Sequence, residues 1–242
     1  MLKSRIPLRR PGQPDETIAD EMMHLFDVQE FGDRNYQTLS GGERQRVVLA
    51  TRNAGKVDEL RRILAPYGIE LVGLDDVPPY DAAPETAPTF VGNAVAKARE
   101  ACAHTGLPAV ADDSGLEVEA LHGMPGVLSA RWAGAHGDDW ANLELVLGQV
   151  QDVPDERRGA RFVCAAAAAL PDGRDLVVEG EMRGALLRAP RGSNGFGYDP
   201  IFQPDGESRS SAELTSDEKD AISHRGKAFR ALAPLLVKAL AG

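Results

Sequence analysis

The sequence contains little cysteine, no long apolar run and no excess of positive charge. Its two cysteines, Cys102 and Cys164, stand far apart, without a CxxC pair or a nearby histidine cluster. Neither a disulfide framework nor a zinc site is therefore expected, and we predict that both thiols are reduced and buried. Basic residues near the start precede no apolar stretch, and nowhere do about 18 apolar residues follow one another. These absences predict a cytoplasmic protein with no secretory signal and no membrane span.

The balance of charge argues against polymeric partners. The 242 residues include 27 Lys and Arg against 37 Asp and Glu, a net charge of -10 at pH 7. A nucleic-acid backbone or an anionic membrane surface requires a basic face, so neither is an expected partner. A single nucleotide requires only a few local cations, so this composition still allows one to bind.

From Val47 onward, apolar runs and amphipathic stretches alternate in a pattern typical of an α/β fold. Strands are predicted over residues 47–50 and 69–74, with a helix between them. Thr89 is placed to cap a second helix, which ends near Gly106. We expect the buried side of that helix to carry Val91, Val95, Ala98 and Cys102.

Further along, the pattern predicts a strand over residues 108–111 that ends at the polar cluster Asp112–Gly115. The turn Pro171–Arg174 separates two apolar runs, over residues 162–170 and 176–181, and so predicts a β-hairpin. Because a hairpin is antiparallel, we expect a mixed central sheet flanked by helices.

Two more helices are predicted in the second half of the chain. One buries Trp140, Leu143 and Leu147. The other begins at the cap residue Ser223 and buries Phe229, Leu232, Leu236 and Leu240.

The first 46 residues do not continue this pattern. Within them, Gln37–Arg46 reads QTLSGGERQR, which resembles the signature sequence of ATP-binding-cassette ATPases. The chain has no GxxxxGKS/T loop to hold phosphates and no apolar strand ending in an Asp-Glu pair, so this segment alone should not hydrolyse ATP. We predict an inert extension over residues 1–46, resembling a truncated piece of such an ATPase, and a catalytic domain over residues 47–242. A partner-binding extension is the alternative.

Two groups of residues are candidates for binding phosphates and a metal ion. Thr51, Asn53 and Lys56 lie at a strand-to-helix turn, where helix N–H groups and an ammonium can converge on a polyphosphate. Asp112 and Asp113 are adjacent carboxylates that would repel each other in a cleft unless a cation such as Mg²⁺ offsets their charge. Each group also has a purely structural interpretation, as a helix cap with a solvated lysine and as a polar turn.

Two further groups could recognise a base. Residues 195–200 (GFGYDP) combine glycines, which allow close backbone approach, with two aromatic rings that offer a stacking face. Ser223, His224 and Arg225 open a helix, with Lys219 before them, and supply hydrogen-bond donors. The alternatives are aromatic side chains that anchor the loop and a pair of surface residues.

Together and in this order, the four groups resemble the motifs of the inosine/xanthosine triphosphate pyrophosphatase family, over about four-fifths of the chain from Val47 to about Leu240. The resemblance implies an α/β fold with a mixed central sheet flanked by helices and two lobes that enclose a nucleotide cleft. It implies Mg²⁺-dependent hydrolysis of ITP, dITP and XTP between the α and β phosphates, which gives the monophosphate and pyrophosphate. A homodimer is implied as well.

The resemblance also assigns roles to individual residues. Asp113 would be the general base and a Mg²⁺ ligand, and Glu85 the second metal-binding carboxylate. His224 and Arg225 would donate to the 6-oxo group of the base. The substrate-binding residues that it implies are Thr51, Arg52, Asn53, Ala54, Gly55, Lys56, Ser114, Phe196, Gly197, Tyr198, Asp199, Lys219, His224 and Arg225. The chain departs from the family at Gly92, where related sequences are expected to carry Glu.

Two other functions stay open from the sequence. The chain could be an interaction module derived from an ATP-binding-cassette ATPase, which would bind a transporter ATPase and hydrolyse nothing. It could instead be a pyrophosphatase for modified pyrimidine or methylated nucleotides on a similar fold. Comparing pyrophosphate release from purine and pyrimidine triphosphates distinguishes the three.

Overall fold

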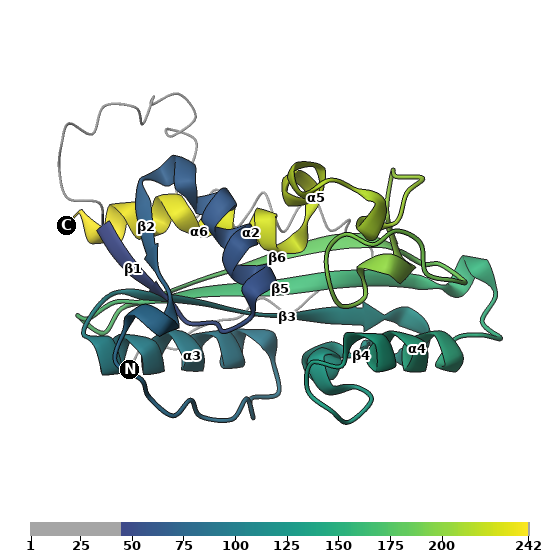
Figure 1. The fold of residues 1–242 in the computed structure, drawn as a ribbon, viewed down its shortest axis with the longest axis horizontal. Coiled ribbons are helices and arrows are strands. Elements are labelled where there is room, and N and C mark those ends of the chain that lie inside the picture. The colour runs from purple at the N-terminus through teal and green to yellow at the C-terminus, as the bar shows by residue number, and fades with distance from the viewer. Residues whose placement is uncertain (1–44, 242) are drawn as a thin grey trace, which may run out of the picture. The chain divides into compact units, whose positions relative to one another are not determined.

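The computed structural model describes residues 45–241, except for the side chain of Ala54 (Figure 1). Residues 37–44, which carry most of the ATP-binding-cassette resemblance, lie outside the described residues. Gln45 and Arg46 are the first two residues of strand β1 and pair in parallel with Ile69 and Glu70. The strand predicted from Val47 therefore begins two residues earlier, inside the segment assigned to the extension.

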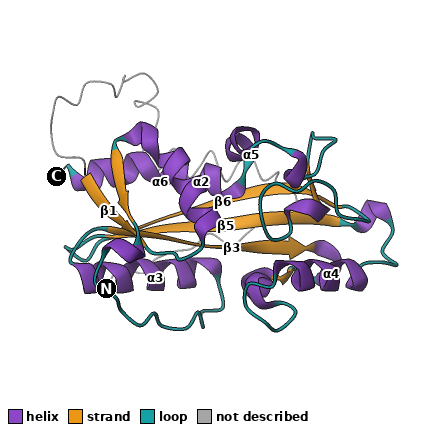
Figure 2. Cartoon of the chain, viewed as in Figure 1, coloured by secondary structure: helices purple, strands orange, loops and turns teal. Residues whose placement is uncertain are grey.

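A mixed sheet of seven strands runs through the described part of the chain (Figure 2). Strand β1 pairs in parallel with β2 and β3, and the remaining pairs are antiparallel. The strand order is β2-β1-β3-β5-β6-β7, with β4 beside β3. This confirms the mixed sheet and the hairpin predicted from the sequence. The strands are β1 Gln45–Leu49, β2 Ile69–Val72, β3 Ala109–Val118, β4 Met124–Pro125, β5 Gly159–Ala169, β6 Asp175–Leu186 and β7 Phe202–Pro204.

Helices cover both faces of the sheet (Figure 1). Helices α2 and α6 pack on one face and α3 packs on the opposite face. Helix α4 lies towards the other end of the sheet, in a third apolar cluster with β3, β5 and β6. Each face is closed by its own cluster of buried apolar side chains. The helices are α2 Ala54–Leu64, α3 Phe90–Thr105, α4 Asp139–Gln149, α5 Ser216–Ile222 and α6 His224–Leu240.

The predicted helix caps are present. The Thr89 hydroxyl accepts a hydrogen bond from the Gly92 N–H at 3.1 Å, and the Ser223 hydroxyl accepts one from the Gly226 N–H at 2.9 Å. Gly106 ends α3 in the left-handed region, with φ of 69°. These local signals predict both helix starts and the end of α3 because they act through neighbouring residues alone.

Small side chains on the central strand β5 allow helices to approach closely from both sides. Side chains alternate between the two faces of a strand. Ala165 and Ala167 accordingly belong to the apolar cluster beneath α3, whereas Ala166 and Ala168 belong to the cluster beneath α2 and α6. All four are at most 1% exposed.

The acidic cluster Asp112–Gly115 lies within strand β3 and not at its end, so the predicted strand over residues 108–111 is too short. Strand β5 accompanies β3 along its whole length, from the Ala109 pair to the Val118 pair. Strand β1, by contrast, pairs with β3 at its first two residues alone. The polar residues thus occupy the part of β3 that lies beyond the end of β1. A long partner strand on one side keeps them extended, and no local pattern reveals that partner.

Two helices bury only some of the side chains predicted for them: Ala98 and Cys102 in α3 and Leu143 in α4 are buried as expected. In α4, Trp140 is 57% exposed, while Leu143 and Val146 are buried. The first turn of α4 serves polar contacts, because Asp139 accepts a hydrogen bond from the Gly197 N–H at 2.8 Å. In α3 the buried side includes Asn93, whereas the valines expected there are partly exposed.

Cys102 and Cys164 are buried free thiols, as predicted. The helices among residues 45–241 include none with the length and apolar character that crossing a membrane requires.

We predict that Gly180→Ala destabilises the fold. Gly180 lies in β6 beneath the first turn of α6, where a Cβ would overlap the His224 carbonyl oxygen and lie 2.7 Å from the Ala228 nitrogen. Overpacking of this kind costs about 1–3 kcal/mol in unfolding free energy, which urea denaturation measures. Gly148→Ala is the matched control, because a Cβ at that position in α4 meets nothing within 4 Å. An unchanged midpoint for Gly180→Ala would contradict the close contact between helix and strand.

Candidate active site

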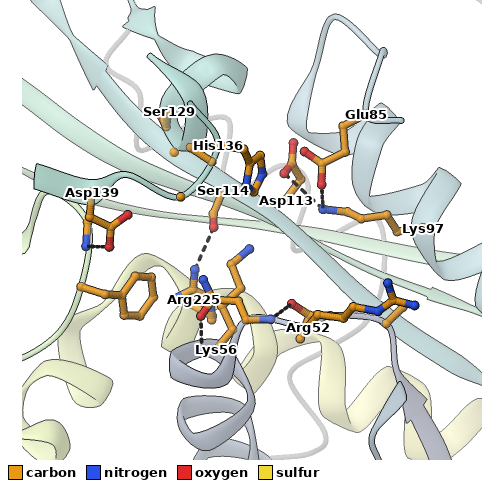
Figure 3. A pocket seen from close by; sticks show the side chains of 18 of the residues that line it. Arg52, Lys56, Glu85, Lys97, Asp113, Ser114, Ser129, His136, Asp139 and Arg225 are labelled. Atoms are coloured by element: carbon orange, nitrogen blue, oxygen red, sulfur yellow. Dashed lines mark hydrogen bonds and ion pairs between the residues drawn. The ribbon is translucent and has the colours of Figure 1, made fainter. Parts of the chain in front are cut away.

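A pocket of about 580 Å³ gathers the residues predicted from the sequence. It is lined by the turn after β1, the middle of β3, the loop before β7 and the start of α6 (Figure 3). Every predicted site residue lines it apart from Gly55, which lies beside the Phe196 ring, and Ala54, whose side chain is not described. The fold therefore brings together motifs that are distant in the sequence.

The turn after β1 presents the N-terminus of α2 to this pocket. Asn53 caps the helix by accepting a hydrogen bond from the Lys56 N–H at 3.1 Å, and Thr51 accepts one from the Asn53 N–H at 3.2 Å. Arg52 reaches the Tyr80 carbonyl oxygen at 3.4 Å. Unpaired N–H groups and the helix dipole make such a terminus favourable for anions.

Asp112 and Asp113 serve different parts of the structure because neighbouring side chains on a strand point to opposite faces. Asp112 is 1% exposed and accepts hydrogen bonds from Lys56 Nζ at 2.9 Å and Arg225 Nε at 3.2 Å. Burial favours the neutral acid, but these cations prevail and hold the pKa of Asp112 well below its usual range. From the sequence we expected one cation in a cleft to offset both carboxylates. That expectation is wrong, because the two side chains lie on opposite faces of the strand.

Asp113 points to the other face, where its environment favours proton uptake. It is 7% exposed, and burial raises its pKa despite the neighbouring Lys97 and Asn93. Its Oδ2 accepts a hydrogen bond from Asn93 Nδ2 at 2.9 Å, and its Oδ1 lies 3.2 Å from Lys97 Nζ. A carboxylate with a raised pKa is a stronger base than an exposed aspartate.

Lys97 on α3 joins the two carboxylates that were predicted to bind metal. Its Nζ lies 3.0 Å from Glu85 Oε1 and 3.2 Å from Asp113 Oδ1, and Figure 3 shows the side chain reaching between them. Burial lowers the pKa of Lys97, but the surrounding carboxylates outweigh it and raise the pKa overall. The pKa of Glu85 is lowered because Lys97 outweighs the effect of burial. Sequence reasoning missed Lys97, since a lysine on a helix is an ordinary solvated residue until its neighbours are known.

Glu85 and Asp113, the two predicted metal ligands, are too few to make a complete metal site by themselves. Between residues 45 and 241, no three His, Cys, Asp or Glu side chains are grouped to hold a metal ion. The two carboxylates nevertheless converge on one cationic centre, the Lys97 ammonium. Mg²⁺ commonly binds through one or two carboxylates, together with waters and substrate phosphates. The pair therefore fits Mg²⁺ whose remaining ligands are waters or substrate phosphates.

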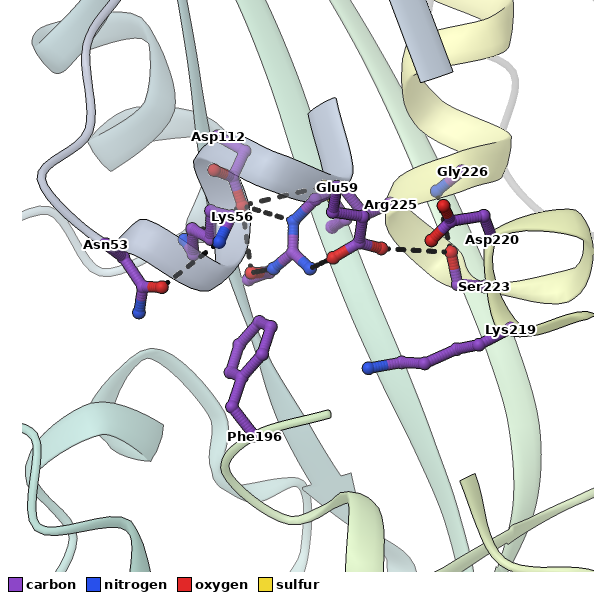
Figure 4. A network of polar contacts seen from close by, with 12 residues as sticks. Asn53, Lys56, Glu59, Asp112, Phe196, Lys219, Asp220, Ser223, Arg225 and Gly226 are labelled. Carbon is purple, nitrogen blue, oxygen red and sulfur yellow. Dashed lines mark hydrogen bonds and ion pairs between the residues drawn. The ribbon is translucent and has the colours of Figure 1, made fainter. Parts of the chain in front are cut away.

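Arg225 is the centre of a buried polar network beneath the pocket (Figure 4). Its guanidinium donates from Nη1 to Glu59 Oε2 at 2.6 Å, from Nε to Asp112 at 3.2 Å and from Nη2 to Ser114 Oγ at 2.8 Å. Arg225 and Glu59 are 2% and 3% exposed. Arg225 lines the pocket, but its Nε, Nη1 and Nη2 atoms all donate hydrogen bonds to protein side chains. Its role as a contact to the base therefore stays a prediction. Glu59 was not predicted, because its importance depends on this partner.

The glycine-aromatic loop is held in place by its own carboxylate. Asp199 Oδ2 accepts a hydrogen bond from the Phe196 N–H at 2.9 Å and pairs with Lys219 Nζ. A Cβ at Gly195 would overlap this oxygen, and the φ of Gly195 is 74°, so glycine is required. The Phe196 ring lies 5.0 Å from Lys219 Nζ and 5.5 Å from Arg225 Cζ.

Tyr198 and His224 both line the pocket, and both rings are buried. The Tyr198 hydroxyl donates to the Ser129 carbonyl oxygen at 2.8 Å, so Tyr198 anchors the loop. Burial, followed by Arg225, lowers the pKa of His224 well below its usual range, which makes the imidazole neutral. The ring stacks on Phe162, and its Nδ1 has no hydrogen-bond partner among the described residues.

The model of the Ham1 family matches residues 47–235. The chain belongs to the Ham1 family. Neither this match nor the relatives below support the likeness of Gln37–Arg46 to an ATP-binding-cassette ATPase.

Relatives of this Ham1 chain are similar over almost their full length. The chain is 61% identical over 193 residues to a dITP/XTP pyrophosphatase of Streptomyces coelicolor, covering 79% of this chain and 96% of the relative. It is 62% identical over 194 residues to a dITP/XTP pyrophosphatase of Nocardia farcinica, covering 79% and 94%.

Solved structures of similar proteins share the fold of this Ham1 chain. A nucleoside-triphosphatase / dITP/XTP pyrophosphatase from Mycobacterium abscessus is 59% identical, with a TM-score of 0.65, covering 79% of this chain and 98% of that one. The Staphylococcus aureus Ham1 protein is 36% identical, with a TM-score of 0.71, covering 79% and 97%.

We predict that Arg225→Met destabilises this Ham1 domain strongly, because it leaves the carboxylates of Glu59 and Asp112 buried without their shared cation. Breaking a buried pair by removing one partner costs about 3–5 kcal/mol, and urea denaturation measures the change. Arg99→Met is the control: it removes an arginine that is also paired, with Asp175, but is 65% exposed. Similar small shifts for both variants would show that the network does not stabilise the fold.

Proposed function

We propose that this chain hydrolyses dITP and XTP, together with ITP, to the nucleoside monophosphate and pyrophosphate. Relatives named dITP/XTP pyrophosphatase, at about 60% identity over nearly their whole length, support this activity. The observation that carries the proposal is one pocket that holds both the α2 N-terminus with Lys56 and the carboxylates of Glu85 and Asp113.

In the proposed complex, the triphosphate binds at the N-terminus of α2. The N–H groups of the 51–56 turn and the Lys56 ammonium offset the negative charge that develops on the leaving pyrophosphate. Asp112 holds Lys56 Nζ at 2.9 Å, so this charge is in position before the substrate binds. A group oriented in advance costs little reorganisation when the reaction occurs.

Glu85 and Asp113 are the residues that we propose would hold Mg²⁺. Bound Mg²⁺ supplies positive charge close to the phosphate oxygens. Asp113 in addition orients a water for in-line attack on phosphorus and accepts its proton, a role that suits the raised pKa of this buried carboxylate.

We further propose that the pocket is a cleft between two lobes, one with α2 and α3 and the other with α4 and the 195–199 loop.

The proposed base site lies beside Phe196 and His224. A neutral imidazole can donate one hydrogen bond, and the Tyr198 N–H can supply another, since the Phe196 and Gly197 N–H groups are bonded to carboxylates. A 6-oxo purine accepts these bonds, whereas the 6-amino group of adenine leaves the donors unpaired. Each buried unpaired group costs about 1–3 kcal/mol, which favours inosine and xanthosine nucleotides over ATP.

The homodimer and the cytoplasmic location that we expect from the sequence stay predictions. Light scattering on the purified chain tests the first, and cell fractionation tests the second.

We predict that, with Mg²⁺, the chain releases pyrophosphate from XTP, dITP and ITP faster than from ATP, dUTP and dTTP. The physical reason is that 6-oxo purines satisfy the donors beside His224 and Phe196. Pyrophosphate release across the six substrates gives kcat/KM for each. A preference for dUTP or dTTP would replace the proposal with a pyrimidine pyrophosphatase, and no hydrolysis at all would favour an interaction module.

We predict that Asp113→Asn lowers kcat for XTP by about 10²- to 10⁴-fold, the range expected when a general base is lost. The variant keeps the shape of the side chain, so circular dichroism should match that of the wild type. Asp172→Asn, in the exposed turn of the β5–β6 hairpin, is the matched control and should keep full activity. Retention of kcat in Asp113→Asn would exclude Asp113 as the base.

A further inference from the structure

One buried amide connects the two segments that carry the proposed metal ligands. Asn93, on α3, is 2% exposed. Its Oδ1 accepts a hydrogen bond from the Ala87 N–H at 2.9 Å, two residues after Glu85. Its Nδ2 donates to Asp113 Oδ2, also at 2.9 Å. The same side chain therefore holds the loop of Glu85 and the carboxylate of Asp113.

The chemistry of an amide explains why this position carries asparagine. The Ala87 N–H requires an acceptor and the Asp113 carboxylate requires a donor, and a side-chain amide supplies both from one rigid plane. The two partners also determine which end of the amide is oxygen. Aspartate would lack the donor, and leucine would lack both groups.

Lys97 lies one helical turn after Asn93 and makes the corresponding charged contacts. It reaches Glu85 at 3.0 Å and the Oδ1 atom of Asp113 at 3.2 Å. The two oxygens of Asp113 are thus held separately, one by each residue, which determines the orientation of the carboxylate plane. Residues four apart share one face of a helix, so α3 presents both contacts together.

Gly92 leaves the space that this arrangement requires. A Cβ at position 92 would lie 2.7 Å from the Ala87 Cβ and 3.2 Å from the Thr89 hydroxyl oxygen. Real Cβ atoms do not approach a neighbouring carbon so closely, so a side chain here would push the 85–87 loop away from α3. The glycine that departs from the sequence expectation therefore allows Ala87 to reach Asn93.

We propose that Asn93 is a positioning residue, which sets the separation and orientation of the Glu85 and Asp113 carboxylates, and that Gly92 makes this possible. The contacts are independent of the reaction, but their effect on turnover rests on the proposed function. Preorganised groups lose activity steeply when they move, with a displacement of about 1 Å costing up to about 10²-fold. Substrate contacts at the α2 N-terminus are separate from Asn93 and should be unaffected.

The first test compares the same substitution at two buried asparagines. Asn93→Asp keeps the acceptor for Ala87 but replaces the donor to Asp113 with a carboxylate oxygen. We expect kcat for XTP to fall on the order of 10- to 100-fold, with KM within about threefold of the wild type. Asn142→Asp is the control, because Asn142 is 1% exposed and accepts from the Ala133 N–H at 2.7 Å, while its Nδ2 has no partner in the described residues. Equal kcat losses in both variants would reduce Asn93 to an ordinary structural residue and overturn the proposal.

The second test is a double-mutant cycle at the contact between loop and helix. Gly92→Ala introduces the methyl that meets Ala87. We expect this variant to have a lower kcat and to bind Mn²⁺ more weakly in the absence of nucleotide. The EPR signal of free Mn²⁺ measures the binding. Ala87→Gly removes the carbon that this methyl meets. The double variant should therefore regain most of both losses, whereas independent effects would add. No recovery in the double variant would overturn the role of Gly92.

The two readouts separate this proposal from the proposed function. Suppose that the wild type hydrolyses no triphosphate but binds Mn²⁺, that Gly92→Ala weakens Mn²⁺ binding, and that the double variant restores it. This result supports the positioning role and refutes the activity. A wild type that hydrolyses XTP while Asn93→Asp and Gly92→Ala keep its kcat and Mn²⁺ affinity refutes the positioning role alone. A protein that neither hydrolyses nor binds Mn²⁺ overturns both.

Discussion

The carboxylate of Asp112 is buried where water cannot solvate it, and the rest of the site depends on how that charge is neutralised. Lys56 and Arg225 both lie within 3.2 Å of its Oδ2 atom. Removing a charge from water is costly unless partners lie close to it. Lys56 comes from α2, Arg225 from α6 and Asp112 from β3, so one buried anion holds three elements together. Glu59 extends the network by pairing with Arg225 at 2.6 Å.

The alternation of side chains along β3 gives two adjacent aspartates opposite tasks. Asp112 points towards α2 and α6, where its pKa is depressed and its charge is permanent. Asp113 points towards α3, where burial raises its pKa. A strand provides this division without any insertion or turn, because consecutive side chains leave on opposite faces. A permanently paired carboxylate and the proposed base can therefore be adjacent in sequence and still lie in different electrostatic surroundings.

The alanines of strand β5 and Gly180 of strand β6 determine how closely the helices pack on the sheet. Small side chains let α3 and α6 lie close to the sheet from either side. Asn93 and Lys97 can then reach Asp113 from one face, while Arg225 reaches Asp112 from the other. Larger side chains on β5 would move the helices outward and lengthen these contacts. The dimensions of the core thus determine the geometry of the polar site.

Much of the fold and most of the candidate site could be predicted from sequence, because the signals are local. Thr89 and Ser223 cap helices through the next few residues, and the Pro171–Arg174 turn lies in the five-residue connection between β5 and β6. The motif residues line one pocket because the turn after β1, the loop before β7 and the start of α6 meet the middle of β3 there. Such signals require no knowledge of distant partners.

The tertiary structure alone decided the rest. The length of β3 depends on β5, more than 40 residues later in the chain, and the exposure of Trp140 depends on where the core ends. Asn93, Lys97 and Glu59 look like ordinary helix residues until the carboxylates and the guanidinium that face them are in place. The sequence by itself determined which elements form and which motifs they carry, since those follow from neighbouring residues. Which charges are paired, and which carboxylate has a raised pKa, follow from burial and long-range contact, which only the folded chain supplies.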